Sequence, residues 1–159
     1  MKIITLTQNK FAKVDDDDFE DLSRYKWCYG AHGYAFRSVY IDGKRKTVYM
    51  HRDVNKTPDG FFTDHINGDK LDNTKKNLRT CTSSQNQMNS RIRKKKSEYP
   101  RGVYYYSNPK QNKKPWKASL NINGKTKYLG TFETMELALQ ARIKAEKIWY
   151  GEFSHLRGL

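Results

Sequence analysis

Residues 63–90 read TDHINGDKLDNTKKNLRTCTSSQNQMNS, and this stretch decides how the middle of the chain folds. Residues 61–66 form a strand-like run, 67–69 are turn residues (Asn-Gly-Asp), and 77–82 read as a returning strand. Ser83 or Ser84 can cap a helix that follows at once. The sequence therefore predicts the order strand, long loop, strand, helix.

The polar residues of this stretch suit hydrolysis of a phosphodiester. Asp64 offers a carboxylate and Asn86 an amide oxygen, which are hard ligands of the kind that Mg²⁺ prefers. A histidine with an ordinary pKa near 6.5, such as His65, can accept a proton at neutral pH. Neighbouring strand residues face opposite sides of a sheet. Asp64 and His65 can therefore serve one phosphate only if the strand twists or ends there.

The charge of the chain points to a polyanionic partner. The net charge is +14, yet residues 1–64 hold 11 Lys/Arg against 10 Asp/Glu, and residues 65–159 hold 20 against 7. An aromatic content of 13% argues against disorder. Cys28 and Cys81 have no CxxC spacing, so we expect two reduced thiols. No apolar run approaches the roughly 20 residues of a membrane span. We expect no membrane association and a cytoplasmic location.

The segments on either side of this stretch read as small sheets with helices. In the first part we expect strands at 2–7 and 11–14, a short helix from the acidic run 15–18, and a hairpin of 34–40 and 46–50 around Asp42-Gly43. The sequence does not reveal the function of residues 1–50, which read as a strand-rich extension that can also touch DNA. In the last part we expect strands at 102–106, 116–122 and 125–130, with an Asn123-Gly124 turn. A helix over 133–150, ended by Gly151, should lie on that sheet through Ala138, Ala141, Ala145 and Ile148.

Taken together, the polar residues resemble the HNH nucleases of the ββα-metal fold, in the subtype of phage homing endonucleases. The resemblance covers about 48–90 and has these matching pieces: His51-Arg52, 64–69 (DHINGD), 71–73 (LDN), 77–79 (NLR), Thr82 and Gln85-Asn86. It implies that His65 is the general base, that Asp64 and Asn86 bind Mg²⁺ or Mn²⁺, and that Asn77 braces the loop and orients the His65 strand as part of the catalytic set. It also implies 5′-phosphate and 3′-hydroxyl products. For Arg52 we expect a phosphate contact or a bracing role.

Residues 101–151 resemble the plant APETALA/ethylene-response-factor type of DNA-binding domain. The matching pieces are 101–103 (RGV), 116–118 (WKA), 128–132 (YLGTF) and the alanine-striped helix. The resemblance implies that a three-stranded sheet enters the major groove with the helix behind it. We expect Trp116 and Tyr128 to line the groove side. The residues expected to contact DNA from this sheet and its rim are Arg101, Tyr104, Tyr106, Trp116, Lys117, Ser119, Asn121, Lys125 and Lys127.

The basic run 91–96 lies between these two parts. It is either a linker that follows DNA phosphates, through Arg91, Arg93, Lys94, Lys95 and Lys96, or an inert linker. The expected architecture is α+β: residues 1–90 with the HNH motif at 48–90, a linker at 91–98, and a DNA-binding domain at 99–159. The expected function is a monomeric, metal-dependent endonuclease that nicks double-stranded DNA at directed sites. The alternative is a non-catalytic DNA-binding regulator with a degenerate nuclease site.

Overall fold

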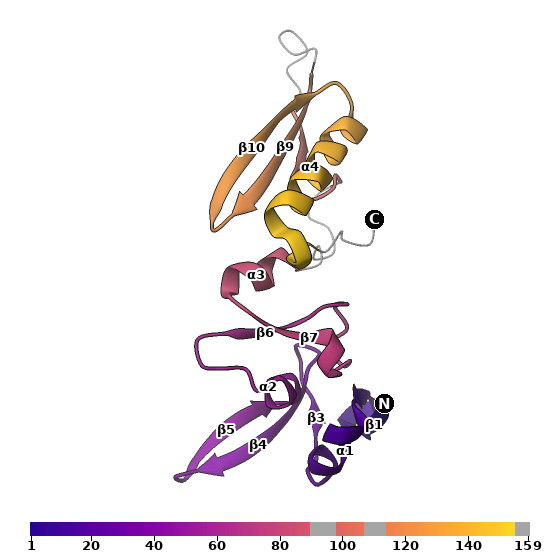
Figure 1. Ribbon diagram of the computed structural model, residues 1–159, viewed down its shortest axis with the longest axis vertical. Helices are drawn as coiled ribbons and strands as arrows, with labels where there is room; N and C mark the ends of the chain where they lie inside the picture. Colours follow the sequence, from indigo (N-terminus) through magenta and orange to yellow (C-terminus); the bar gives the residue numbers. More distant parts are fainter. Residues whose placement is uncertain (90–97, 107–113, 155–159) are drawn as a thin grey trace. The chain divides into compact units, whose positions relative to one another are not determined.

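The computed structural model describes residues 1–89, 98–106 and 114–154, and the chain divides into two compact units, Met1–Asn86 and Gln87–Leu159. Each unit combines helices with small antiparallel sheets, in agreement with the predicted α+β class (Figure 1). The run 91–96, with its five proposed phosphate contacts, lies outside the described residues. None of the described helices is both long and apolar enough to cross a membrane.

The first unit begins with a two-stranded sheet and a helix. Strand β1 (Lys2–Thr5) pairs with β2 (Phe11–Val14), and a 3₁₀ turn, η1 (Thr7–Asn9), lies between them. Helix α1 (Asp16–Ser23) starts in the acidic run, where negative side chains favour the positive end of the helix dipole. Ile4, Val14 and Leu22 are buried in one core cluster. These elements confirm the predicted strand, strand, helix order.

A three-stranded sheet follows, made of β3 (Cys28–Tyr29), β4 (Ala35–Ile41) and β5 (Lys44–Tyr49). Asp42 and Gly43 join β4 to β5 with φ of 51° and 70°. Positive φ at both central residues is the geometry of the tight turn that matches strand twist, so the predicted Asp-Gly hairpin is confirmed. β5 runs directly into α2 (Met50–Asn55), whose Met50 and Val54 enter the same core cluster.

The HNH-like stretch forms a two-stranded ribbon and a short helix. β6 (Phe62–His65) pairs with β7 (Leu78–Cys81), and the 3₁₀ turn η2 (Lys75–Asn77) precedes β7. Helix α3 (Ser83–Met88) comes next, so the predicted order is present. The predicted Ser83 or Ser84 cap is wrong by one position or more. Thr82 Oγ1 accepts from Gln85 N at 3.3 Å, and Gln85 Oε1 accepts from Thr82 N at 2.8 Å, which is a reciprocal capping box.

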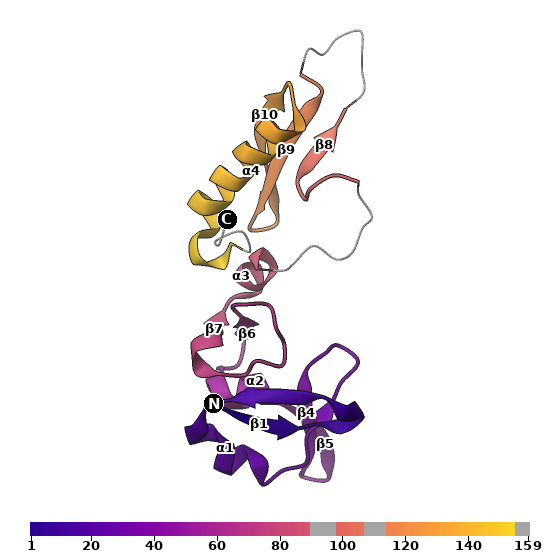
Figure 2. The ribbon, with the colours of Figure 1, turned by 90° about the vertical axis from the view of Figure 1, so that its right-hand side faces the viewer.

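The second unit is a sheet with one long helix. Its strands are β8 (Val103–Tyr105), β9 (Trp116–Ile122) and β10 (Lys125–Phe132), with β9 in the middle. Helix α4 (Met135–Tyr150) covers one face of the sheet, and a 3₁₀ turn, η3 (Gly151–Phe153), follows it (Figure 2). The buried residues of this interface include Val103, Ala118, Leu120, Ala138 and Ala145.

The buried side of α4 differs from the predicted alanine stripe. Ile148 is 77% exposed, so its predicted place against the sheet is wrong. An ion pair takes part of that side instead: Arg142 Nη2 lies 2.5 Å from Glu146 Oε1, and both side chains are almost fully buried. Arg142 Nε also donates to the carbonyl of Arg101 at 3.2 Å. Buried charges of this kind persist because they are paired and hydrogen-bonded, a feature that an apolar pattern does not reveal.

The backbone at Gly102 approaches this ion pair closely. A Cβ at Gly102 would lie 2.4 Å from the carbonyl oxygen of Ser119 and 2.5 Å from Arg142 Nε, whereas a Cβ at Gly124 would meet nothing within 4 Å. Both glycines have positive φ, near 77° and 79°. A substitution at Gly124 therefore reports backbone strain alone, whereas one at Gly102 reports backbone strain together with steric crowding.

We predict that Gly102→Ala destabilises the second unit more than Gly124→Ala does. Gly124→Ala should cost about 1 kcal/mol for the left-handed backbone. Gly102→Ala should cost about 1–3 kcal/mol more, the usual range for overpacking. Urea unfolding followed by tryptophan fluorescence measures both changes. Equal destabilisation in the two variants would contradict the crowding described at Gly102.

Candidate active site

His65 is the last residue of β6, and its imidazole is buried. Its Nε2 lies 3.2 Å from Asn73 Oδ1. The amide nitrogen of Asn73 donates to the carbonyl of Leu71 at 3.3 Å and contacts Met50 Sδ at 3.5 Å, so the amide oxygen is the atom turned to the imidazole. An amide oxygen can only accept a hydrogen bond. The proton of a neutral His65 therefore resides on Nε2, and Nδ1 is the basic nitrogen.

Asn77 holds the loop between β6 and β7 from both of its sides. Its Nδ2 donates to the carbonyl of Asp72 at 2.7 Å, and its Oδ1 accepts from the backbone N–H of Asn67 at 2.9 Å. The carbonyl of Asn77 also accepts from Ile66 N at 2.8 Å, directly after His65. These bonds provide the geometry that the predicted bracing role requires.

Asp64 occupies the neighbouring strand position and has a different environment. Arg79 faces it across the ribbon, and its Nε and Nη2 donate to Asp64 Oδ2 at 2.8 and 2.6 Å. The Asp64 and Arg79 side chains are only 6% and 12% exposed. The guanidinium offsets the carboxylate charge and should weaken the attraction of Asp64 for a cation. A shared metal position between Asp64 and Asn86, which lies in α3, stays a prediction.

An aromatic wall lies on one side of His65: Tyr34 and His51 contact its ring, and Tyr49 stacks on His51. The His51 and His65 rings lie 5.2 Å apart edge to face, and the Tyr34 ring lies 4.8 Å from His51 and 5.9 Å from His65. Tyr49 stacks on His51 at 5.5 Å. Each of these distances joins ring centroids. The wall removes water from one side of His65.

Both histidines are held neutral by this environment. Burial lowers the pKa of His51 to about 3, with the nearby His65 as a second cause, and His51 Nδ1 has no hydrogen-bond partner among the described residues. Burial also lowers the pKa of His65, while the Asn73 bond and the carboxylates of Asp64, Asp69 and Asp72 act in the opposite direction. A neutral His65 at physiological pH is the form that can accept a proton.

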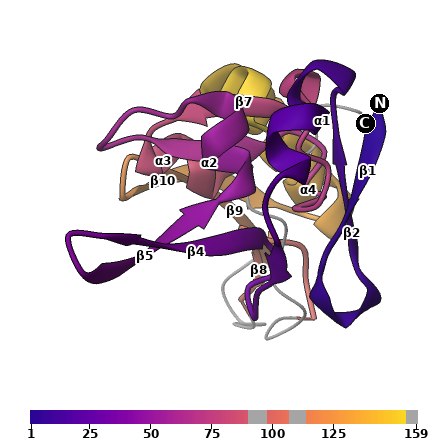
Figure 3. The same ribbon diagram turned by 90° about the horizontal axis from the view of Figure 1, so that it is seen from below.

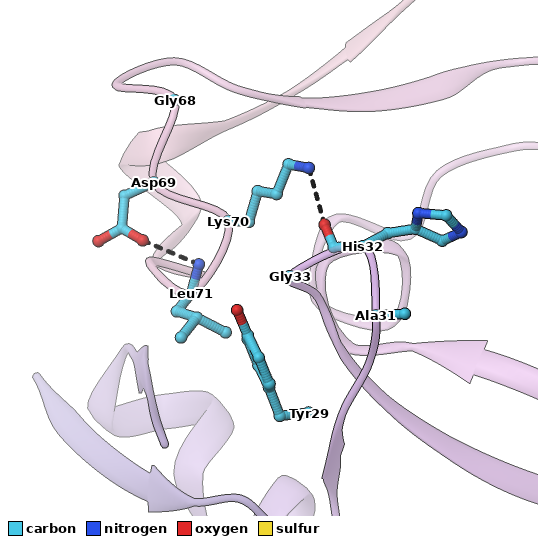
Figure 4. A pocket seen from close by; sticks show the side chains of 8 residues that line it. All are labelled: Tyr29, Ala31, His32, Gly33, Gly68, Asp69, Lys70 and Leu71. Carbon is cyan, nitrogen blue, oxygen red and sulfur yellow. Dashed lines mark hydrogen bonds between the residues drawn. The ribbon is translucent and has the colours of Figure 1, made fainter. Parts of the chain in front are cut away.

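Lys70 attaches the loop before β4 to the motif (Figure 4). Its Nζ donates to the carbonyl of His32 at 2.8 Å and lies 4.5 Å above the centroid of the Tyr34 ring. Asp69 Oδ1 accepts from Leu71 N at 3.0 Å in the same turn. His32, Asp69, Lys70 and Leu71 border an open cavity of about 400 Å³. Lys70 thus fixes the ring that lies against both histidines.

Arg52 contacts backbone rather than open solvent. Its Nη1 donates to the carbonyl of Phe61 at 2.8 Å, and its Nη2 lies 3.4 Å from the carbonyls of Thr57 and Pro58. These bonds hold the segment that leads into β6. They support the bracing role over the proposed phosphate contact.

The second unit sorts the proposed DNA contacts onto two faces of its sheet. The register β8–β9–β10 places Tyr104, Lys117, Ser119, Asn121 and Tyr128 on the face opposite α4. Tyr104 and Tyr128 are 55% and 59% exposed. Lys117 Nζ lies 4.0 Å above the exposed Tyr106 ring. This face is not covered by the helix, so the proposed contacts on it stay predictions.

Three proposed contacts fall on the helix-covered face instead. Trp116 packs with the core cluster of Val103, so its expected place on the groove side is wrong. Trp116 shares the alternation of Ala118 and Leu120, which turns all three toward α4. Lys127 Nζ lies 4.5 Å above the Trp149 ring of α4, and Lys125 has the same strand phase as Lys127. Arg101 is exposed just before β8.

Both cysteines of the chain are free thiols. This state of Cys28 and Cys81 agrees with the prediction, and burial raises the pKa of Cys81 to about 11. Within residues 1–89, 98–106 and 114–154, no group of three or more His, Cys, Asp or Glu side chains is arranged to hold a metal ion. An ion held among these residues would therefore have at most two such side chains as ligands.

Three residues of the site were not assigned from sequence. Asn73 belongs to the quoted LDN piece, but nothing in the sequence shows that its amide meets His65. Arg79 follows from the ribbon register, which sets it opposite Asp64. Tyr34 lies 31 positions before His65, and no local pattern connects the two.

Comparisons with known proteins agree with the motif. Residues 55–88 match the family model described as HNH endonuclease. Over 151 residues the chain is 34% identical to a protein of Acanthamoeba polyphaga mimivirus that bears the name of an uncharacterized HNH endonuclease, with 91% of this chain and 73% of that protein covered. No solved structure matches the chain significantly. The segment that matches the family model contains Asp64, His65, Asn77 and Asn86.

The low pKa of His51 predicts acid sensitivity of the fold. An unfolded chain protonates His51 near pH 6.5, but the folded chain does so only near pH 3. The unfolded state therefore binds more protons between these values, and stability falls as pH drops from 6.5 toward 3. His51→Phe should remove this contribution, which amounts to about 2–3 kcal/mol at pH 4.5 and almost nothing at pH 7. Urea unfolding at both pH values tests this. An identical acid-induced destabilisation of both proteins would contradict it.

Proposed function

Because the chain belongs to the HNH endonucleases, and is thus a nuclease, we propose that it cuts double-stranded DNA with the help of a divalent metal ion. The finer proposal is a monomeric, cytoplasmic, homing-type nickase that leaves 5′-phosphate and 3′-hydroxyl ends. The observation that supports the proposed DNA cleavage is the neutral His65, whose Nε2 is paired with Asn73 and whose Nδ1 is the basic nitrogen.

In the proposed reaction, His65 Nδ1 takes a proton from water while the water oxygen attacks phosphorus. The bond between phosphorus and the 3′ oxygen breaks, and that oxygen leaves with a proton from solvent. The phosphate stays bonded to the 5′ oxygen of the downstream nucleotide, and the upstream nucleotide ends in a 3′-hydroxyl. Asn73 holds the imidazole orientation through the step, and Asn77 holds the loop that carries Asn73.

The donor set at this site fits Mg²⁺ or Mn²⁺. Asp64 and Asn86 would hold the ion as hard oxygen ligands, with water and the DNA phosphate completing its shell. The ion supplies neutralisation of phosphate charge and stabilisation of the leaving oxygen when it is bound. Since Arg79 already offsets the charge of Asp64, we expect tight metal binding only when DNA is present.

The second unit is proposed to bind the DNA. Its helix-free face presents Tyr104, Lys117, Ser119 and Tyr128, and a sheet of this size fits the major groove. The 91–96 run is proposed to follow the phosphates. Phosphate contacts release counterions, so affinity should fall steeply with salt.

One alternative is supported by the Asp64–Arg79 ion pair. A carboxylate occupied by a guanidinium suits a DNA-binding regulator whose nuclease site no longer takes metal. Binding of Mn²⁺ to the protein–DNA complex separates the two proposals. Loss of that binding in Asp64→Asn and Asn86→Ala supports the nuclease.

We predict that His65→Ala abolishes Mg²⁺-dependent nicking of supercoiled plasmid. Loss of a general base typically costs 10²–10⁴-fold in rate. Affinity for DNA should persist, since the groove-facing sheet is unchanged. The matched control is His32→Ala, which removes an exposed histidine and should nick normally. Equal nicking by wild type and His65→Ala would refute the assignment.

A second prediction concerns Asn73. Asn73→Leu removes the acceptor for His65 Nε2 in a similar volume and should lower the nicking rate at least about tenfold at saturating DNA. Asn73→Asp keeps an acceptor and adds a negative charge that raises the pKa of His65. In wild type the nicking rate should fall at a pH below 6.5, because burial lowers the pKa of His65. In Asn73→Asp this acid-side fall of the rate should occur at a higher pH. Rates from pH 5 to 8.5 give the answer. Coincident acid limbs in Asn73→Asp and wild type would contradict the contact.

A further inference from the structure

The β4–β5 hairpin reaches past the rest of its unit (Figures 1 and 3). Its distal half carries Lys44, Arg45 and Lys46, all exposed, against a single acid, Asp42, in the turn. Tyr40, at 75% exposed, lies beside them. A two-stranded ribbon without a covering layer is only marginally stable in water. A basic ribbon built this way suits a surface that is covered when a partner binds.

One face of this ribbon is continuous with the surroundings of His65. Register pairs Tyr40 with Arg45, Ser38 with Thr47 and Phe36 with Tyr49, and these pairs share a face because strand side chains alternate. Arg45 Nε donates to Ser38 Oγ at 3.0 Å along it.

The base of that face leads into the aromatic wall. Tyr49 stacks on His51, whose ring lies 5.2 Å from that of His65. Phe36, Thr47 and Tyr49 also line a hollow of about 200 Å³ at this end. This face of the ribbon therefore leads from its basic tip to Tyr49, which contacts the buried rings of His51 and, through it, His65.

We propose that the β4–β5 ribbon is a second DNA-binding element, which lies in a groove of the duplex beside the phosphate that is cut. The proposal rests on the proposed nuclease function, because the His65 end of the face fixes where the DNA lies. Arg45 lies on this face, whereas alternation places Lys44 and Lys46 on the opposite face. The major groove admits a two-stranded ribbon, so cations on both of its faces can reach phosphates.

The size of the ribbon sets the length of the contact. Five residue steps separate the pair Phe36–Tyr49 from the pair Ile41–Lys44. At about 3.4 Å per residue the ribbon extends roughly 17 Å. That length spans about five base pairs at roughly 3.4 Å each. The contact should therefore cover about five base pairs to one side of the nick.

The test compares two sets of three substitutions in the full chain. The ribbon set is Lys44→Gln, Arg45→Gln and Lys46→Gln. The control set is Lys10→Gln, Arg24→Gln and Lys26→Gln, which removes the same charge from exposed positions outside the ribbon. The probe is a mixed-sequence DNA duplex, bound without divalent metal at several salt concentrations. A plot of log affinity against log salt falls with a negative slope, and the ribbon set should make this fall less steep by about 2.7. That value is about 0.9 for each phosphate that a removed cation had neutralised. The control set should leave the slope unchanged.

Asp42→Asn provides a variant whose effect unfolding cannot mimic. Asparagine accepts the positive φ of 51° at this turn, and the change removes the single acid of the ribbon. Affinity for the duplex should rise several-fold. Equal slope changes in both sets, or no gain in Asp42→Asn, would overturn the proposal. The proposal would also fail if the three ribbon substitutions removed binding to anionic lipid vesicles but left the affinity for DNA unchanged.

Nicking keeps this outcome separate from that of the proposed function. The ribbon set should nick more slowly than wild type at low plasmid concentration, because the lost contacts lower its affinity for DNA. Saturating plasmid and Mg²⁺ should reduce this difference, because the ribbon does not touch the reacting atoms. If wild type fails to nick, the nuclease proposal falls, whereas the salt slopes still decide whether the ribbon binds DNA.

Discussion

Neighbouring residues of a β-strand project to opposite faces, and the site depends on how β6 meets this constraint. Asp64 and His65 are adjacent, and His65 is the residue at which the strand ends. Their side chains consequently have separate partners. Asp64 is paired with Arg79, while His65 is paired with Asn73 and enclosed by aromatic rings. The strand end, together with the loop held by Asn77, gives the imidazole its own orientation.

This separation leaves the Asp64–Arg79 pair and the two histidines without net charge before the proposed DNA substrate binds. The Asp64 carboxylate is offset by Arg79, and burial keeps both histidines uncharged at physiological pH. A phosphodiester with its metal ion can enter such a site without displacing a strong resident charge. The cost appears at His51, whose buried Nδ1 has no hydrogen bond within the part of the chain that the structure describes. Burial of an unpaired polar nitrogen commonly costs about 1–3 kcal/mol.

Local signals were sufficient for much of the fold. Asp42-Gly43 predicted a hairpin because both positions need positive φ, and strand alternation with the acidic run located β1, β2 and α1. Contacts distant in sequence were beyond such signals. No pattern connects Tyr34 with His65, and no apolar period reveals the Arg142–Glu146 pair that displaced Ile148 from the buried side of α4. The place of Trp116 could have been predicted from the sequence, because strand alternation puts it on the same face as the apolar Ala118 and Leu120.

The basic tip of the ribbon and the neutral site at its base serve different steps of recognition. Charge at the tip acts over a Debye length of about 8 Å and is screened by salt, so it should govern encounter and affinity. The buried groups near His65 act only at contact, where screening is weak and geometry decides the rate. The face from Arg45 to Tyr49 would connect the two. Binding energy gained along the ribbon can then hold one phosphate against His65, whose neutral imidazole does not itself attract it by charge.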